Sequence, residues 1–296
     1  MIVIIRCFCH SQLDSYKSII VHKELSMDHS NDFCYFWRGK CIRPASATDC
    51  SAPARIERRG SGRSRALLLL HGFSSSPAVF RHLTDIFDAY DAVFAPVLPG
   101  HATSIADFSV ATAAAWIHAA ENACSTLVKE YAHVDVLGLS LGGILADHLS
   151  HVFPINHLFL LAPAFKLTFN VHLALAAAHL LRVCGVHTLA ATGGDIISPD
   201  HAELTYRRIP IAVILEILQL IRGISFGPPK CPTDLFLGRH DHVVDCSATA
   251  KLFNGLDNVQ VHWLENSAHV LPLDGDAQRI ISVINAIHLK THSPFD

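Results

Sequence analysis

The strongest constraint on the fold of this chain is a serine set between two glycines, in the sequence GLSLG at residues 138–142. An apolar run at 134–139 leads into it, and residues 142–151 have a composition typical of a helix. A strand can turn this tightly into a helix only if small residues stand two positions before and two positions after the serine. The serine hydroxyl then projects above the sheet. The pattern predicts Ser140 as a nucleophile; the alternative is a glycine-rich turn that only packs a helix on a sheet.

Short apolar runs alternate with helical stretches from about residue 65 onward. This alternation indicates an α/β protein with a mostly parallel sheet that helices cover on both faces. We expect strands at 66–70, 92–97, 134–139, 157–161, 233–237 and 259–264, and helices at 111–131, 142–151 and 276–288.

Residues 165–229 interrupt this rhythm. Their composition is helical at 171–183 and 211–221, and the segment begins and ends beside strands, so we expect a helical cap inserted into the core. The core would then comprise residues 63–164 and 230–296. Residues 6–62 are polar, carry cysteines and lack clear periodicity, so we expect residues 1–62 to form an N-terminal extension outside the core, with Met27 as an alternative start.

Composition limits the partners of the protein. A net charge of −3 and a pI of about 6.7 give no electrostatic basis for binding nucleic acid or an anionic membrane. The apolar run 2–5 ends at Arg6, and the run 173–181 is broken by His179, so neither is long enough to insert into a bilayer. The sequence does not indicate an oligomeric state.

The nine cysteines are an odd number and lack paired C-x-x-C motifs. We therefore expect reduced thiols in a cytoplasmic protein. A zinc site built from Cys34, Cys41, Cys50 and a histidine is the alternative, and we expect no bound metal.

A nucleophilic serine needs a base, and the base needs a carboxylate to orient it. His269 lies just beyond the last expected strand, and Asp241 directly follows the strand that ends at residue 237. The order serine, aspartate, histidine is one in which such triads occur. We therefore predict Ser140, Asp241 and His269 as a catalytic triad. Asp245 is a competing candidate for the acid, and Asp195, inside the insertion, is a weaker one.

An oxyanion hole would use backbone N–H groups beside the nucleophile and in the loop after the first strand. In this chain those groups belong to Leu141 and Phe73, and we predict both as donors. We expect His71 to hold the early loop in place rather than to take part in catalysis.

Five segments together resemble the bacterial carboxylesterase and monoacylglycerol lipase branch of the α/β-hydrolase superfamily. They are LLLLHGFSSSP (67–77), PVLPGHA (96–102), VLGLSLGG (136–143), GRHDHVVDCSA (238–248) and ENSAHVLPLD (265–274). Epoxide hydrolases and dehalogenases carry an aspartate where this chain has Ser140. The chain departs from the family at Cys246, where relatives often carry proline.

The resemblance implies an α/β-hydrolase fold and hydrolysis of carboxylic esters through an acyl-serine intermediate, without metal or cofactor. It also implies a small ester or lipid substrate, with short or medium acyl chains or a monoacylglycerol, and a cap whose apolar face lines the acyl pocket. Thioester, amide or lactone hydrolysis and acyl transfer on the same triad remain open. Two other possibilities also remain open. The chain could be a non-catalytic relative that binds a small apolar molecule, or it could act at a membrane surface.

Overall fold

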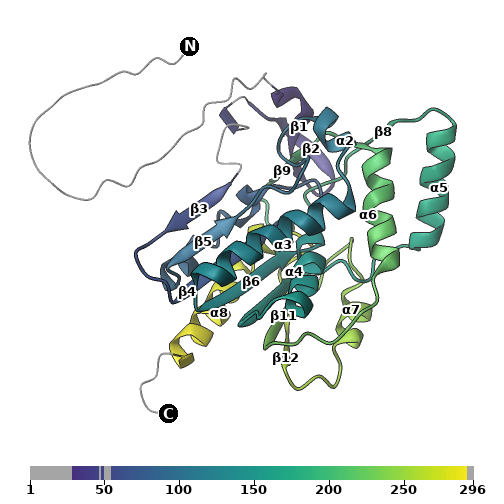
Figure 1. Ribbon diagram of the computed structural model, residues 1–296. Coiled ribbons are helices and arrows are strands. Elements are labelled where there is room, and N and C mark those ends of the chain that lie inside the picture. The colour runs from purple at the N-terminus through teal and green to yellow at the C-terminus, as the bar shows by residue number, and fades with distance from the viewer. Residues whose placement is uncertain (1–28, 47, 50–54, 292–296) are drawn as a thin grey trace, which may run out of the picture.

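The computed structural model describes residues 29–46, 48–49 and 55–291 (Figure 1). At its centre is a seven-stranded sheet in the order β12-β11-β7-β6-β4-β5-β3. Neighbouring strands are parallel except β3, which is antiparallel to β5. The predicted α/β fold with a mostly parallel sheet is therefore confirmed. The strands are β3 (Ile56–Arg59), β4 (Arg65–Leu70), β5 (Ala92–Ala95), β6 (His133–Leu139), β7 (His157–Leu161), β11 (Thr233–Gly238) and β12 (Val259–Leu264).

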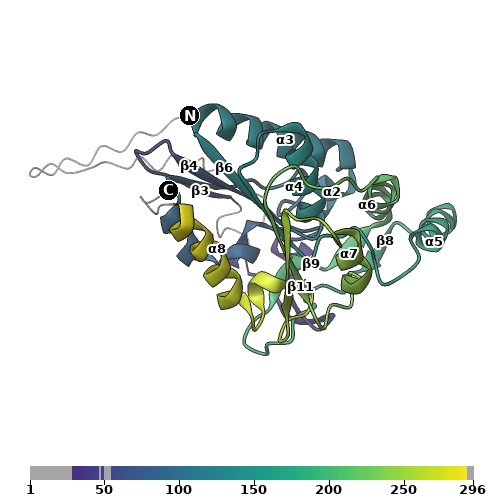
Figure 2. The same cartoon turned by 90° about the horizontal axis from the view of Figure 1, so that it is seen from below.

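Both faces of the sheet are covered, as Figure 2 shows. Side chains alternate along a strand, so the fully buried β4 supplies two cores: Leu68 and Leu70 enter one, Leu67 and Leu69 the other. The first core is completed by α3 (Ala113–Glu130), α4 (Leu141–Val152) and α7 (Cys246–Leu252), and the second by α8 (Ala277–Thr291), η2 (Pro77–Phe80) and η3 (Thr84–Ala89). The remaining short helices are η1 (Ser30–Asp32), α2 (Ile105–Ser109) and η4 (Leu271–Leu273).

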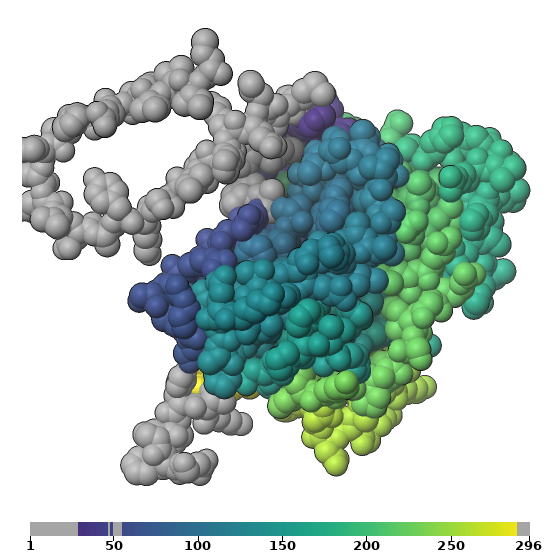
Figure 3. Space-filling model, in the orientation of Figure 1, coloured from purple at the N-terminus to yellow at the C-terminus, as the bar shows by residue number. Residues whose placement is uncertain are grey.

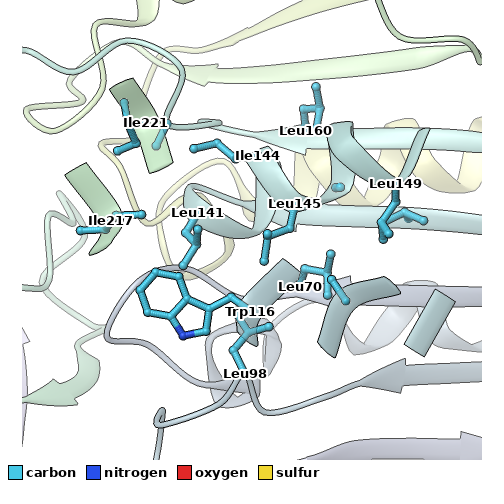
Figure 4. Packing of buried hydrophobic residues seen from close by; sticks show 14 of the residues in the cluster. Leu70, Leu98, Trp116, Leu141, Ile144, Leu145, Leu149, Leu160, Ile217 and Ile221 are labelled. Carbon is cyan, nitrogen blue, oxygen red and sulfur yellow. The ribbon is translucent and has the colours of Figure 1, made fainter. Parts of the chain in front are cut away.

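The chain between β7 and β11 forms the insertion, which stands beside the core in Figure 3. It contains α5 (Val171–Val183), β8 (Thr188–Ala190), β9 (Glu203–Tyr206), β10 (Arg208–Pro210) and α6 (Ile211–Gly223). Both expected helices are present, and three short strands accompany them. In Figure 4, Ile217 and Ile221 of α6 face Leu141 and Ile144 of α4, so the apolar core continues into the cap.

Residues 33–44 and 56–59 contain three strands, although the sequence shows no clear periodicity there. β3 is an edge strand of the central sheet, while β1 (Phe33–Trp37) and β2 (Lys40–Pro44) form a hairpin. β1 also pairs with β9 of the cap in antiparallel register, with Phe36 opposite Glu203. The resulting sheet, β2-β1-β9, joins the N-terminal region to the insertion.

The expectation of reduced thiols is wrong for Cys34 and Cys41, which form a disulfide across this hairpin. The antiparallel pairing brings their Cα atoms to 5.9 Å, a separation that disulfides commonly span. Cys50, the third residue of the zinc alternative, lies outside the described residues. Within the described ranges, no group of three or more His, Cys, Asp or Glu side chains could hold a metal ion. Nor does this part of the chain include a helix with the length and apolar character to cross a membrane.

Candidate active site

Ser140 lies at the sharp turn between β6 and α4. Its backbone has φ 55° and ψ −112°, a conformation that L-residues other than glycine rarely adopt. The glycines on either side are required by space: a Cβ on Gly138 would collide with the carbonyl of Gly142, and one on Gly142 with the carbonyl of Leu70. The turn therefore presents the serine above the carboxyl edge of the sheet, as the GLSLG sequence predicts.

Two hydrogen bonds connect the three residues predicted as a triad. The Ser140 Oγ lies 2.9 Å from His269 Nε2, and His269 Nδ1 lies 2.8 Å from Asp241 Oδ2. Asp241 follows β11 and His269 follows β12. Because these strands and β6 are parallel members of one sheet, their carboxyl ends bring all three side chains to the same edge.

Asp241 and His269 are both buried, and each shifts the pKa of the other. Burial alone would raise the pKa of Asp241, but the charge of His269 and the N–H groups of Val243 and Val244 outweigh it, so its pKa is lowered. Burial alone would lower the pKa of His269, but the charges of Asp241, Asp195 and Glu203 outweigh it, so its pKa is raised. The pair is therefore arranged to hold a proton on the imidazole opposite an ionised carboxylate.

The two competing acids have other contacts. The Asp245 carboxylate caps α7 by accepting the N–H of Ala248 at 2.8 Å. Asp195 accepts hydrogen bonds from His242 through its carboxylate and from the backbone of His269 through its carbonyl. Of the three candidate acids, it is Asp241 that binds the imidazole ring.

The loop after β4 passes close to Ser140, since a Cβ on Gly72 would lie 3.5 Å from the serine Cβ. Its conformation depends on His71, whose Nε2 accepts the Leu98 N–H at 3.0 Å and whose Nδ1 lies 2.9 Å from the Gly72 carbonyl. Burial lowers the pKa of His71 to about 4, so the ring is neutral and one nitrogen can accept. The structural role expected for His71 is confirmed, and the loop brings Phe73 to the wall of the site.

Leu141 is the first residue of α4. The N–H groups in the first turn of a helix have no partner within the helix, so this donor is available beside Ser140. Both residues predicted to supply oxyanion donors, Phe73 and Leu141, line the same cavity as Ser140.

An apolar cavity of about 500 Å³ opens beside Ser140 and runs under the cap. This volume is within the usual range for sites that bind small molecules. Side chains of α5, of α6 and of the segment between β7 and α5 form its wall, among them Leu167, Ala178, Leu181, Ile217 and Leu218.

A second cavity, of about 230 Å³, meets the first at Ser140 and also borders His269. Its lining includes the acidic residues Asp195 and Glu203. Glu203 lies on β9 and is buried; its Oε2 accepts the Gly194 N–H at 2.9 Å, and burial raises its pKa. The sequence did not reveal Glu203 as a site residue, because a single acid on a short cap strand belongs to no recognisable motif.

Cys246, which the resemblance places where relatives often carry proline, contacts Asp241, the residue predicted as the acid. Its Sγ lies 3.7 Å from Asp241 Oδ2, the oxygen that also binds His269. Burial raises the pKa of the Cys246 thiol, which therefore keeps its proton and can act as a weak donor to the carboxylate.

Comparison with known proteins shows that this chain is similar to lipolytic enzymes. A family model described as the alpha/beta hydrolase family matches residues 67–283. The thermostable monoacylglycerol lipase of Bacillus sp. (strain H-257) is 29% identical over 221 residues, which are 73% of this chain and 86% of that protein. The carboxylesterase of Bacillus subtilis (strain 168) is 23% identical over 219 residues, 72% of this chain and 87% of that protein.

Among solved structures, one from work on the metagenome-derived lipolytic enzymes LipS and LipT is similar with a TM-score of 0.72 and 28% identity. The similarity covers 80% of this chain and 98% of that one. The shared region thus includes nearly the whole of the solved chain.

Proposed function

The chain belongs to the alpha/beta hydrolase family and is a carboxylic ester hydrolase, and we propose that it cleaves monoacylglycerols or short to medium acyl esters through an acyl-serine intermediate. One observation carries this proposal: Ser140 is hydrogen-bonded to His269, which is hydrogen-bonded to Asp241, at the point where the large apolar cavity meets a smaller cavity whose lining includes Asp195 and Glu203. The reactive hydroxyl thus has a base beside it and room for the two halves of an ester.

In the proposed reaction, His269 Nε2 takes the Ser140 proton as Oγ attacks the ester carbonyl carbon. Asp241 holds the ring in position and stabilises the imidazolium. The tetrahedral intermediate collapses as His269 gives the proton to the leaving alcohol oxygen. Water, deprotonated by the same histidine, then releases the acid and restores the serine.

The negative charge that develops on the carbonyl oxygen needs donors. The N–H groups of Phe73 and Leu141 are proposed to supply them, because both residues line the cavity that Ser140 also lines. Backbone donors held by a loop and a helix end are already oriented before the substrate arrives, which favours the transition state.

The two cavities support an assignment of the two halves of the substrate. The apolar cavity under the cap suits the acyl chain, and burial of each methylene there contributes about 0.8 kcal/mol. The smaller cavity, whose lining includes Glu203, suits the alcohol half. Glu203 in its wall can exchange hydrogen bonds with neutral hydroxyl groups, and this favours glycerol over an apolar alcohol.

The first test is turnover of p-nitrophenyl esters of increasing acyl length and of a monoacylglycerol, with Ser140→Ala as the control variant. We expect the wild type to hydrolyse both and Ser140→Ala to fold but lose roughly 10⁶-fold in kcat. A folded Ser140→Ala protein with wild-type activity would refute the mechanism. No ester turnover in a protein whose Ser140 still reacts with a fluorophosphonate would point instead to a thioester or amide.

A second test concerns the alcohol half. We expect Glu203→Gln, which keeps an acceptor for Gly194, to raise KM for the monoacylglycerol more than KM for a p-nitrophenyl ester of the same acyl length. Glu130→Gln, at the end of α3, is the control and should change neither value. Equal effects on both substrates would contradict a role for Glu203 in binding the alcohol.

A further inference from the structure

Asp195 of the cap is hydrogen-bonded to the loop that carries the base. It lies between β8 and β9, and its backbone carbonyl accepts the N–H groups of His269 and Val270, each at 3.1 Å. The position of the His269 backbone is therefore set by a residue of the insertion as well as by β12.

The same residue is hydrogen-bonded to the loop that carries the acid. Asp195 Oδ2 accepts the backbone N–H of His242 at 2.9 Å, and Oδ1 lies 2.9 Å from His242 Nδ1. His242 directly follows Asp241, so these bonds fix the chain one residue from the catalytic acid. The carboxylate side chain is only 18% exposed, whereas the His242 ring is 79% exposed.

Asp195 is in turn held by the N-terminal hairpin. The turn between β1 and β2 donates two backbone hydrogen bonds, from Arg38 to the Gly194 carbonyl and from Gly39 to the Gly193 carbonyl. The Gly194 N–H is held by Glu203 on β9, which pairs with β1. Residues 33–44 lie outside the range 67–283 that the family model matches.

We propose that Asp195 is a positioning residue that aligns Asp241 with His269, and that the β1–β2 hairpin holds it in place. The inference rests on the proposed function, because it concerns the same triad. Its physical basis is that a catalytic group displaced by about 1 Å can cost roughly 10²-fold in rate. One residue bonded to both loops limits their relative movement.

The charge of Asp195 adds a second, measurable effect. Three acidic groups act on His269: Asp241, Asp195 and Glu203, and all three raise its pKa. Replacing Asp195 with asparagine removes one of them and therefore lowers the pKa of His269. Since His269 must be neutral to accept the serine proton, the acid limb of the kcat/KM profile should move to lower pH.

The test compares full-length wild type with Asp195→Asn and Asp195→Ala, using p-nitrophenyl acetate and a monoacylglycerol. Both variants should fold, because Asp274 separately binds the N–H groups of Ile197 and Ser198 in the same loop. We expect kcat to fall for both substrates, by about tenfold in Asp195→Asn and more in Asp195→Ala. The acid limb should move to lower pH in both variants.

Asp200→Asn is the matched control, since it removes an exposed carboxylate from the same loop. Wild-type kcat and pH profile in both Asp195 variants would overturn the proposal. So would an equal pH shift in Asp200→Asn, or a rise in KM for the monoacylglycerol alone, which would make Asp195 part of the alcohol site.

If the wild type hydrolyses neither substrate, the proposed function fails, but the alignment can still be measured. The rate at which a fluorophosphonate modifies Ser140 depends on the serine and its base. The positioning role then requires slower modification in both Asp195 variants, and equal rates would refute it.

Discussion

Asp147 on α4 should lower the stability of this protein at neutral and alkaline pH. Its side chain is buried, its Oδ1 has no hydrogen-bond partner among the described residues, and its Oδ2 is 3.8 Å from His151 Nε2. Burial raises its pKa from 3.8 to about 7. The folded state therefore holds a proton on Asp147 over a pH range in which the unfolded chain has already lost it.

The sign and size of the effect follow from this difference. Where the folded state binds more protons than the unfolded state, the free energy of unfolding decreases as pH rises. The shift from 3.8 to about 7 corresponds to about 4 kcal/mol in total, of which about 3 kcal/mol is lost between pH 5 and pH 8. Asp147→Asn cannot ionise and should not show this loss.

The assay is urea unfolding of wild type and Asp147→Asn at pH 5 and pH 8. Contributions from other titrating groups cancel when the two proteins are compared at one pH. The free energy of unfolding of Asp147→Asn minus that of the wild type should therefore be about 3 kcal/mol larger at pH 8 than at pH 5. Asp88→Asn, whose wild-type side chain is 89% exposed, is the control and should show no such change. A difference between wild type and Asp147→Asn that is the same at both pH values would refute the reasoning.

Three further predictions concern the site. The acid limb of the kcat/KM profile should have its midpoint above pH 6.5. Because the pKa of His269 is raised, this residue stays protonated to higher pH and cannot act as a base there. A pH series with p-nitrophenyl butyrate checks this. Asp241→Asn should fold and lose about 10⁴-fold in kcat, measured with the same ester, since the imidazole loses the partner that fixes its tautomer; a loss below tenfold would contradict its role. Ala178→Phe should fill part of the apolar cavity and shift preference toward shorter acyl chains, by about tenfold in relative kcat/KM if two methylenes are excluded. Ala176→Phe, on an exposed face of α5, should leave the ratio between chain lengths unchanged.

The strands of the central sheet could be predicted because their signals are local. Buried parallel strands appear as short continuous apolar runs, and the expected strand at 157–161 has the bounds of β7. The proximity of the three proposed catalytic residues could be predicted for a related reason. Each follows the end of a strand, so the strand order alone places Ser140, Asp241 and His269 at one edge of the sheet.

The cap side of the site could not be predicted in this way. Glu203 and Asp195 reach the active site through β9 and the loop before it, and their positions depend on pairing with a hairpin more than 150 residues earlier in the chain. Such pairing leaves no periodic signal, because β9 has only four residues. The disulfide between Cys34 and Cys41 was missed for the same reason, since the sequence did not reveal the hairpin that brings them together.

The sheet formed by β2, β1 and β9 has a consequence for how the protein can be shortened. Among the strands that the structure describes, β9 pairs with β1 alone, so removing residues 33–44 would leave its backbone N–H and C=O groups as an open edge beside the proposed active site. Open edges of this kind promote aggregation and strand exchange between molecules. A chain that begins at Met27 keeps the hairpin, whereas one trimmed to residue 63 is expected to self-associate during expression and storage.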